Sequence, residues 1–188
     1  MNDETTNVER RTVLQLAASI AGVAAIGARP ARADAVPPKP TGKPGDFDFL
    51  TGKWKIANKQ PKAGGFDEFE GEATVYGLLA GIASIEELRI PARKFSGLGL
   101  RLLDVEKKLW ADYWIPSRTG LLTPPPAWGS FVDGVGTWDG DDVDGEAPII
   151  VRGAWDEITP KSCRWRQAVS RDDGKTWVDN WIMHWTRV

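Results

Sequence analysis

Residues 162–188, SCRWRQAVSRDDGKTWVDNWIMHWTRV, decide the fold of this chain. Trp181, Met183 and Trp185 alternate with more polar side chains, and residues 163–169 alternate in the same way, as expected for strands with one buried face. Between the two runs lies Arg171-Asp172-Asp173-Gly174, whose residue types favour a tight turn. The stretch is therefore predicted to form an antiparallel β-hairpin.

The same pattern of short alternating runs and turn residues extends upstream to Phe47. Strands joined by short turns predict an all-β fold, and closing the sheet on itself removes its exposed edges. We therefore expect a single antiparallel up-and-down β-barrel of about 8–10 strands. The candidate strands are residues 52–59, 68–76, 82–90, 98–104, 109–115, 130–138, 149–158, 162–170 and 178–188.

Two motifs at the ends of this region resemble those of the calycin and lipocalin barrels. The first predicted strand carries Gly52-Lys53-Trp54, and the last one ends in Thr186-Arg187. Together with residues 133–138 and 174–181, they make the chain similar to an uncharacterised bacterial branch of calycin-like proteins. The resemblance implies that Arg187 covers Trp54 at a closed barrel end through a cation–π contact. It implies no activity.

The N-terminal segment has the pattern of an export signal. Arg10-Arg11 precede an apolar run over residues 16–28, and Ala31 and Ala33 form an A-x-A-like cleavage site. Paired arginines before a weakly apolar run are typical of the twin-arginine signal. We therefore expect residues 1–33 to be a signal peptide, and the protein to be periplasmic or secreted. Residues 34–45 are predicted to be a proline-rich tether, extended or disordered, and residues 46–188 the barrel domain.

Composition excludes several classes of function. The net charge is −2 and no basic stripe is present, so we expect no nucleic-acid partner. Cys163 is the only cysteine, which rules out an intrachain disulfide, and the single His184 rules out a multi-histidine metal site. The apolar run over 16–28 is too short to span a bilayer, so no stable membrane insertion of the mature form is expected. No cofactor or metal is predicted.

Ten tryptophans are an unusually large number for one small barrel. Large rings either fill the interior or line a cavity for a flat, apolar ligand. Alternation along the predicted strands directs Trp110, Asp112 and Trp114 to one face. We expect the protein to bind a small apolar or aromatic molecule inside the barrel. The candidate ligand-binding residues are Trp110, Asp112, Trp114, Arg152, Trp165, Gln167 and Trp181.

Two other functions stay open at this point. Glu86 and Asp112 are predicted to face inward, and burial raises the pKa of a carboxyl group toward the range of a general acid or base. With Arg152 as a partner, either would suit a cofactor-free isomerase, cyclase or hydratase, a lyase or isomerase in class, acting on a small hydrophobic substrate. The second alternative is a haem-binding barrel related to nitrobindin, with His184 as the proximal ligand. Strand alternation directs His184 outward, which disfavours it.

Overall fold

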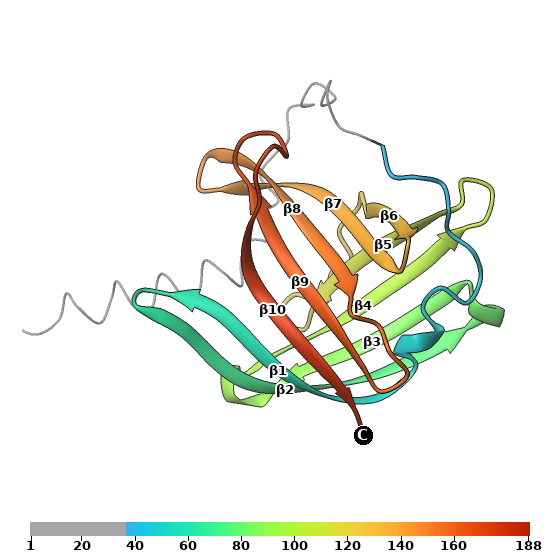
Figure 1. Ribbon diagram of the computed structural model, residues 1–188, viewed down its shortest axis with the longest axis horizontal. Coiled ribbons are helices and arrows are strands. Elements are labelled where there is room, and N and C mark those ends of the chain that lie inside the picture. Colours follow the sequence, from blue (N-terminus) through green and yellow to red (C-terminus); the bar gives the residue numbers. More distant parts are fainter. Residues whose placement is uncertain (1–36) are drawn as a thin grey trace, which may run out of the picture.

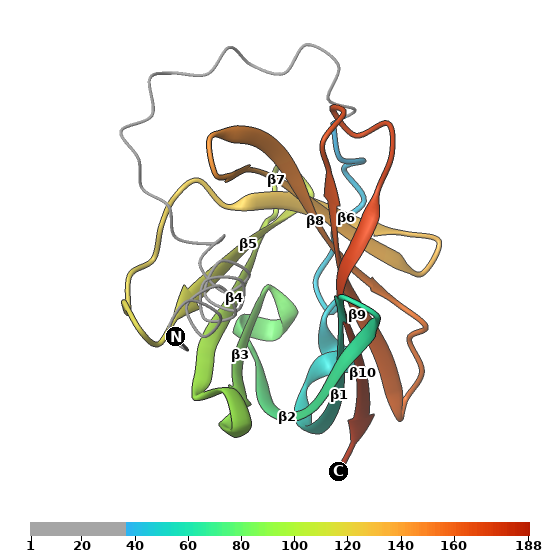
Figure 2. The same cartoon turned by 90° about the vertical axis from the view of Figure 1, so that its left-hand side faces the viewer.

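The computed structural model describes residues 37–188 as a closed antiparallel β-barrel of ten strands (Figures 1 and 2). Each strand pairs with its neighbours in sequence, and β1 pairs with β10 to close the barrel. The prediction of a single all-β, antiparallel up-and-down barrel of about 8–10 strands is thereby confirmed. The predicted signal peptide lies outside the described residues. The strands are β1 (Gly52–Lys62), β2 (Gly65–Leu78), β3 (Ala83–Ile90), β4 (Phe95–Asp104), β5 (Leu109–Pro116), β6 (Ala127–Val132), β7 (Val135–Asp144), β8 (Ala147–Asp156), β9 (Ser162–Ser170) and β10 (Val178–Arg187).

One of the nine predicted strands is wrong, because the structure has two strands in its place. Residues 130–138 are two strands, β6 and β7, joined by a tight turn at Asp133-Gly134. Both turn residues have positive φ angles, 51° and 80°, which glycine and aspartate tolerate better than most residues. An Asp-Gly pair between alternating runs is a strong hairpin signal. Interpreting it as the middle of one strand lost the tenth strand.

The helical elements described in residues 37–188 are three short 3₁₀ turns: η1 (Asp48–Leu50), η2 (Leu79–Gly81) and η3 (Pro91–Arg93). None of the helices in this part of the chain is long and apolar enough to cross a membrane. The first turn, η1, lies across one end of the barrel beside the start of β1 (Figure 1).

The N- and C-terminal strands close this end together. The Arg187 guanidinium lies 4.2 Å from the centroid of the Trp54 ring, as the resemblance to calycins implies. It also donates hydrogen bonds to the backbone carbonyl oxygens of Thr51 (2.6 Å) and Phe49 (2.5 Å). Trp54 Nε1 donates to the carbonyl of Leu50 at 2.7 Å. These contacts tie residues 49–51, at the C-terminal side of η1, to β1 and β10, and so hold η1 over the barrel end.

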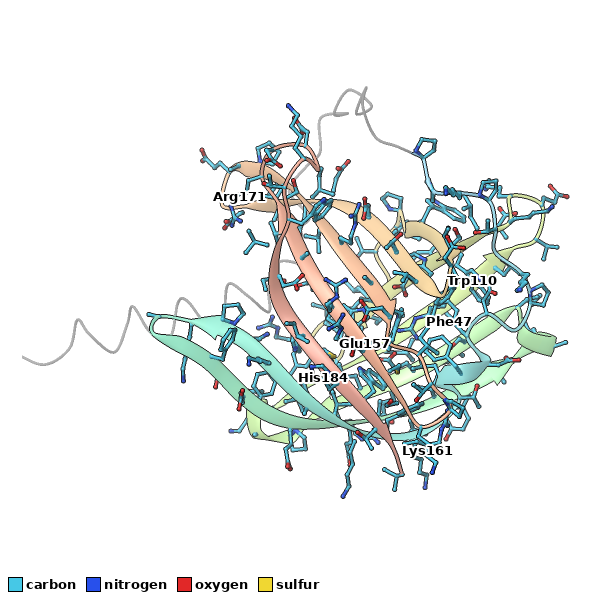
Figure 3. All side chains as sticks on the ribbon, viewed as in Figure 1. Phe47, Trp110, Glu157, Lys161, Arg171 and His184 are labelled. Carbon is cyan, nitrogen blue, oxygen red and sulfur yellow. The ribbon has the colours of Figure 1, made fainter. Side chains whose placement is uncertain are left out.

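Aromatic rings fill the interior beneath η1. The Phe47 ring packs edge-on against Trp110 at a centroid distance of 4.8 Å (Figure 3). Its centroid also lies 5.4 Å from that of Trp138. Trp110 Nε1 donates to the Asp46 carboxylate at 3.1 Å, and Trp138 Nε1 donates to the Trp110 carbonyl at 3.2 Å. This half of the barrel is therefore a closely packed aromatic core whose indole N–H groups have acceptors.

The predicted tether is described only in part. Its C-terminal residues run along the barrel, with Thr41 donating to the Phe131 carbonyl (2.7 Å), the Gly42 amide to Lys108 O (2.8 Å) and the Gly45 amide to Gly81 O (2.9 Å). These hydrogen bonds attach residues 41–45 to the domain. The sequence did not predict this attachment, because the segment carries almost no apolar side chains.

Candidate functional site

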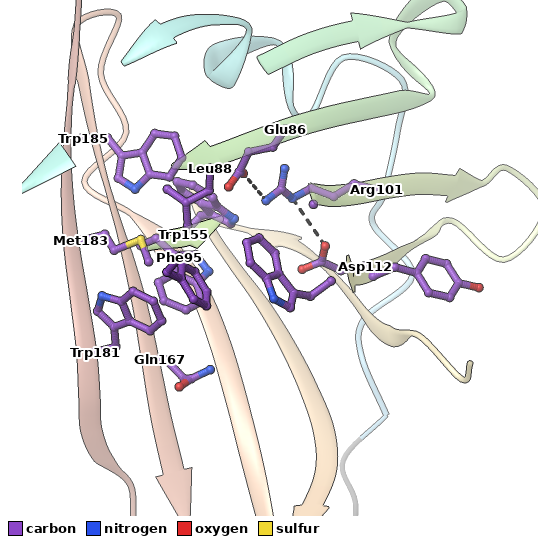
Figure 4. A pocket seen from close by; sticks show the side chains of 14 residues that line it. Glu86, Leu88, Phe95, Arg101, Asp112, Trp155, Gln167, Trp181, Met183 and Trp185 are labelled. Atoms are coloured by element: carbon purple, nitrogen blue, oxygen red, sulfur yellow. Dashed lines mark hydrogen bonds and ion pairs between the residues drawn. The ribbon is translucent and has the colours of Figure 1, made fainter. Parts of the chain in front are cut away.

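The other half of the barrel interior contains a cavity of about 100 Å³ (Figure 4). Half of the residues that line it are aromatic, and polar side chains enter it from β3, β4, β5 and β9. The aromatic lining consists of Phe95, Tyr113, Trp114, Trp155, Trp165, Trp181 and Trp185. The polar lining consists of Glu86, Arg101, Asp112 and Gln167, and Leu88, Gly99 and Met183 complete the wall.

Two glycines on the inner face of β4 make room for this site. A Cβ atom on Gly97 would overlap the Trp114 ring, so that ring lies directly against the β4 backbone. A Cβ on Gly99 would stand 3.2 Å from Arg101 Nη2 and 3.5 Å from the Glu86 Cβ. Side chains larger than hydrogen at these positions would therefore displace both the ring and the guanidinium.

The rings differ in depth. Trp155 and Trp185 are each 1% exposed and pack edge to face at 5.2 Å, and they form the floor of the cavity. Phe95 and Trp114 are half-buried near the mouth, and their rings stack at 5.9 Å with an interplanar angle of 11°. Trp181 packs with the rings near the mouth, since its ring lies 6.0 Å from those of Phe95 and Trp165.

A charged group of three residues borders the rings. Arg101 Nη2 donates to Glu86 Oε2 at 2.6 Å, and both side chains are about 95% buried, with 6% and 4% exposed. Arg101 Nε lies 3.6 Å from Asp112 Oδ1, which is an ion pair but too long for a hydrogen bond. The Asp112 side chain keeps 28% of its surface exposed. Glu86 and Arg101 thus neutralise each other at the floor, while Asp112 has a weaker partner nearer the mouth (Figure 4).

The electrostatics of Asp112 follow from this arrangement. Burial raises the pKa of its carboxyl group to about 6; the charge of Arg101 opposes the rise, and that of Glu86 adds to it. Burial alone would lower the pKa of Arg101, but the negative charges of Glu86 and Asp112 outweigh it and raise that pKa. Arg101 therefore stays protonated, and the group carries a net charge of −1 once Asp112 ionises.

Two nitrogen atoms of Arg101 and one of Trp185 are buried without a hydrogen-bond acceptor among the described residues. The Arg101 guanidinium is instead covered by ring faces, with its Cζ 5.2 Å from the Phe47 centroid and 5.5 Å from that of Trp155. Such cation–π contacts partly replace hydrogen bonds for a planar guanidinium. Arg101 therefore separates the solid half of the barrel from the cavity.

Most of the predicted site residues meet in this cavity. Strand alternation placed their side chains on the inner face, as the structure confirms. Their role in ligand binding or catalysis stays a prediction. The residues brought together are Glu86, Asp112, Trp114, Trp165, Gln167 and Trp181.

Trp110 does not belong to this group. It points inward, as predicted, but it is fully buried at the closed end against Phe47 and lies outside the cavity lining. Four residues of strand separate it from Trp114, roughly 13 Å along β5. Alternation reports which face a side chain occupies and not how deep in the barrel it lies.

Arg152 was predicted to bind the ligand and to pair with Glu86 or Asp112, and the structure places it elsewhere. It lies on the outer face of β8, where it donates to both carboxylate oxygens of Asp139 at 2.7 Å. Its guanidinium also stacks 3.9 Å from the Trp177 ring centroid. Trp155 faces the cavity, and Arg152, three residues away, takes the opposite parity. It therefore pairs with neither Glu86 nor Asp112.

His184 is exposed on the outer face of β10, between Ala57 of β1 and Arg164 of β9. Since it is the only histidine in the sequence, a haem inside the barrel would have no histidine ligand, which contradicts the predicted role of His184 as the proximal ligand. Within residues 37–188, no group of three or more His, Cys, Asp or Glu side chains is placed to hold a metal ion.

Sequence reasoning missed Arg101, the residue that links both carboxylates. In β4 the leucines at 98, 100 and 102 mark one face as apolar, which predicts that face as the buried one. The structure reverses this, because Gly97, Gly99, Arg101 and Leu103 face inward and Leu102 is 38% exposed. The small glycines at alternate positions were the available signal, since they leave room for a long inward side chain.

No family model and no curated protein matches the chain. Similar solved structures include a DUF3598-family protein of unknown function from Nostoc punctiforme PCC 73102, with 13% identity and a TM-score of 0.48 over 82% of this chain and 53% of that one. The S-type phycobiliprotein lyase CPES from Guillardia theta is 11% identical, with a TM-score of 0.48 over 76% and 90% of the two chains. Rv2717c from M. tuberculosis is 12% identical, with a TM-score of 0.47 over 76% and 94%. This chain thus spans about half the length of the Nostoc protein. At such identities the likeness concerns the fold alone.

Proposed function

We propose that this protein binds a small apolar or aromatic molecule in the barrel cavity, and that it does so after export by the twin-arginine route. The observation that carries the binding proposal is the wall of the cavity, in which aromatic rings outnumber polar side chains. Ligand sites for small molecules have this composition, with a few polar groups that orient the ligand.

The incomplete burial of the mouth rings supports a ligand over simple packing. Phe95, Trp114 and Trp165 point inward, yet they are only half-buried, whereas Trp110 and Trp138 at the closed end are almost fully covered. Each 100 Å² of apolar surface left in contact with water costs about 2.5 kcal/mol. A ligand that covers these rings recovers that free energy.

The size of the cavity limits the ligand. An apolar cavity of roughly 150 Å³ holds one benzene ring, and the volume here is about 100 Å³. One ring-sized group therefore fits with small side-chain movements. A longer ligand would extend out of the cavity past the stacked rings of Phe95 and Trp114.

Titration calorimetry with naphthalene and benzene derivatives tests the binding proposal. We expect saturable binding that quenches tryptophan fluorescence, and about a tenfold or greater loss of affinity in Trp114→Ala. Trp177→Phe is the matched control, since Trp177 lies on the outside of the barrel beside Arg152 and should leave the affinity unchanged. No saturable binding, or equal affinities for wild type and Trp114→Ala, would contradict the proposal.

One observation favours a second function, a cofactor-free lyase or isomerase. The pKa of Asp112, raised by burial to about 6, suits a general base near neutral pH, and its carboxylate is not tied by the long 3.6 Å contact to Arg101. Glu86 is a poorer base, because Arg101 holds it at 2.6 Å. Product formation that disappears in Asp112→Asn, with ligand binding retained, would establish this function.

The export proposal rests on Arg10-Arg11 and the apolar run that follows. Replacing both arginines by lysine should leave the precursor uncleaved in the cytoplasm, because the pair is the recognition element of the twin-arginine signal. Cell fractionation and the N-terminal sequence of the exported protein measure this. Normal export of the double-lysine variant would exclude the route.

A further inference from the structure

The charges around the cavity do not balance. Glu86 and Arg101 form a close pair at the floor, joined by a hydrogen bond of 2.6 Å. Asp112 is left with one charged contact, at 3.6 Å, to a guanidinium that is already committed to Glu86. Above pH 6 the site therefore holds one negative charge without a cation of its own.

The surroundings of Asp112 also favour a positive charge. Ring faces carry the negative end of the aromatic quadrupole, and they attract cations that approach within about 6 Å. Trp114 follows Asp112 two residues later on the same face of β5, and stacks with Phe95 at the mouth. An ionised carboxylate beside several aromatic walls is the combination that recognises ammonium groups.

The arrangement disfavours an anionic ligand. Arg101 would be the natural anchor for a carboxylate, since its Nε and Nη1 have no hydrogen-bond acceptor among the described residues. Both atoms are buried, however, its Nη2 is hydrogen-bonded to Glu86, and the rings of Phe47 and Trp155 cover the guanidinium. An anion entering the mouth would meet Asp112 first. Two like charges in a poorly solvated cavity repel strongly.

We propose that the ligand of this cavity is an organic cation, with an ammonium group beside Asp112 and an apolar or aromatic part among Phe95, Trp114 and Trp181. This inference rests on the proposed binding function and names the chemical class of its ligand. The ammonium supplies the charge that Asp112 lacks, and the rings cover the remainder.

Two molecules of nearly equal shape separate charge from shape: phenyltrimethylammonium and tert-butylbenzene. Calorimetric titration at pH 7.5 should show the cation binding at least about tenfold more tightly than its neutral isostere. In Asp112→Asn the preference should vanish, with the neutral probe bound as before, and in Asp112→Glu it should return. Asp139→Asn is the matched control, because it removes one carboxylate from the outer face of the barrel and should keep the preference.

The possible results separate a failure of the cation inference from a failure of the proposed binding function. If tert-butylbenzene binds as tightly as the cation, or if Asp112→Asn keeps the preference, the inference fails while apolar binding stands. If neither probe binds wild type in a saturable manner, the cation inference and the proposed function fall together. Circular dichroism of each variant confirms that it is folded before its affinity is interpreted.

Lowering the pH offers a second readout. Asp112 faces Arg101 from β4, Glu86 from β3 and the uncharged Ala127 from β6. Protonation of Asp112, with its pKa of about 6, removes the attraction for the cation. The affinity for phenyltrimethylammonium should therefore drop about tenfold from pH 7.5 to pH 5, and that for tert-butylbenzene should stay constant. Parallel changes for both probes would overturn the role of Asp112.

Discussion

The two halves of this barrel interior are built from the same residue type in opposite ways. At the closed end, Trp110 and Trp138 are almost fully buried, and both indole N–H groups have acceptors. In the open half, Trp114 and Trp165 remain half-buried, and the buried Nε1 of Trp185 has no acceptor among the described residues. The strands are continuous through both halves, so the strand pairing does not cause the difference.

The cause is what covers each end. Phe47 and η1, which precede the first strand, fill the closed end with a further ring and a turn of backbone. The described residues place no such plug over Phe95 and Trp114. A barrel of this size is therefore stabilised at one end and left incompletely packed at the other, and binding sites are commonly drawn from such less stable regions.

Removing a ring from the closed end should give the largest effect. Trp110→Ala should lower the free energy of unfolding by about 3–5 kcal/mol, because it leaves a large cavity in the core and removes one of the two N–H groups that donate to the Asp46 carboxylate, the other being the Lys43 amide. Urea denaturation followed by circular dichroism measures it. Trp110→Phe, which retains most of the ring contacts, should cost less than half as much, and equal losses would show that packing is not the source.

Asp112→Asn should stabilise the protein at pH 7.5 by about 3 kcal/mol. The pKa of Asp112 is raised from 3.8 to about 6, and each unit corresponds to roughly 1.4 kcal/mol of preference for the protonated form. The folded state favours the protonated form of Asp112, and this contribution to the free energy of unfolding is present below pH 3.8 and is lost as the pH rises through 6. The asparagine variant never ionises, so its advantage should shrink to near zero by pH 4.

Thermal or urea unfolding of both proteins between pH 4 and 8 tests this sign. An asparagine variant less stable than wild type at pH 7.5 would mean that the ion pair with Arg101 outweighs burial. Cys163 does not complicate the window, because burial raises the pKa of its thiol to about 12.

The fold could be predicted because its signals are local. Alternation and turn residues occur within each hairpin, and they placed Glu86, Asp112 and Trp114 on the inner face. The tenth strand was lost because the turn at Asp133-Gly134 has only two residues.

The site was harder to predict because it depends on non-local geometry. Alternation places Trp110 and Trp114 on the same face and does not distinguish them. Trp110 belongs to the core because the Phe47 ring, from a distant segment, packs against it, whereas Trp114 lines the cavity. Arg152 lies in β8, where Ile149, Ile150 and Val151 are consecutive apolar residues, so the alternation gives no clear inner face. Arg101 was missed because the leucines of β4 lie on its outer face, where the sequence pattern indicates the buried face.

Truncating a ring at the open end should cost less stability than at the closed end. Trp114→Ala should lower the free energy of unfolding by about 1–2 kcal/mol, because the ring is already half-exposed and water can enter the space. The comparison with Trp110→Ala, in the same urea experiment, sharpens the contrast between the two halves. Equal losses would show that the open half is core as well, and that its rings are needed for folding.

The smallest effect is expected on the outside of the barrel. Arg152→Gln removes a two-pronged ion pair with Asp139 and the stacking on Trp177, in a position where about a third of each charged side chain is exposed, 34% and 33%. Surface ion pairs of this kind contribute up to about 1 kcal/mol, and salt screens them. We expect a loss of at most about 1 kcal/mol that shrinks in 1 M NaCl, with unchanged affinity for phenyltrimethylammonium and tert-butylbenzene. A drop in affinity would place the outer face in the binding site and break the division of the barrel into a solid end and a binding end.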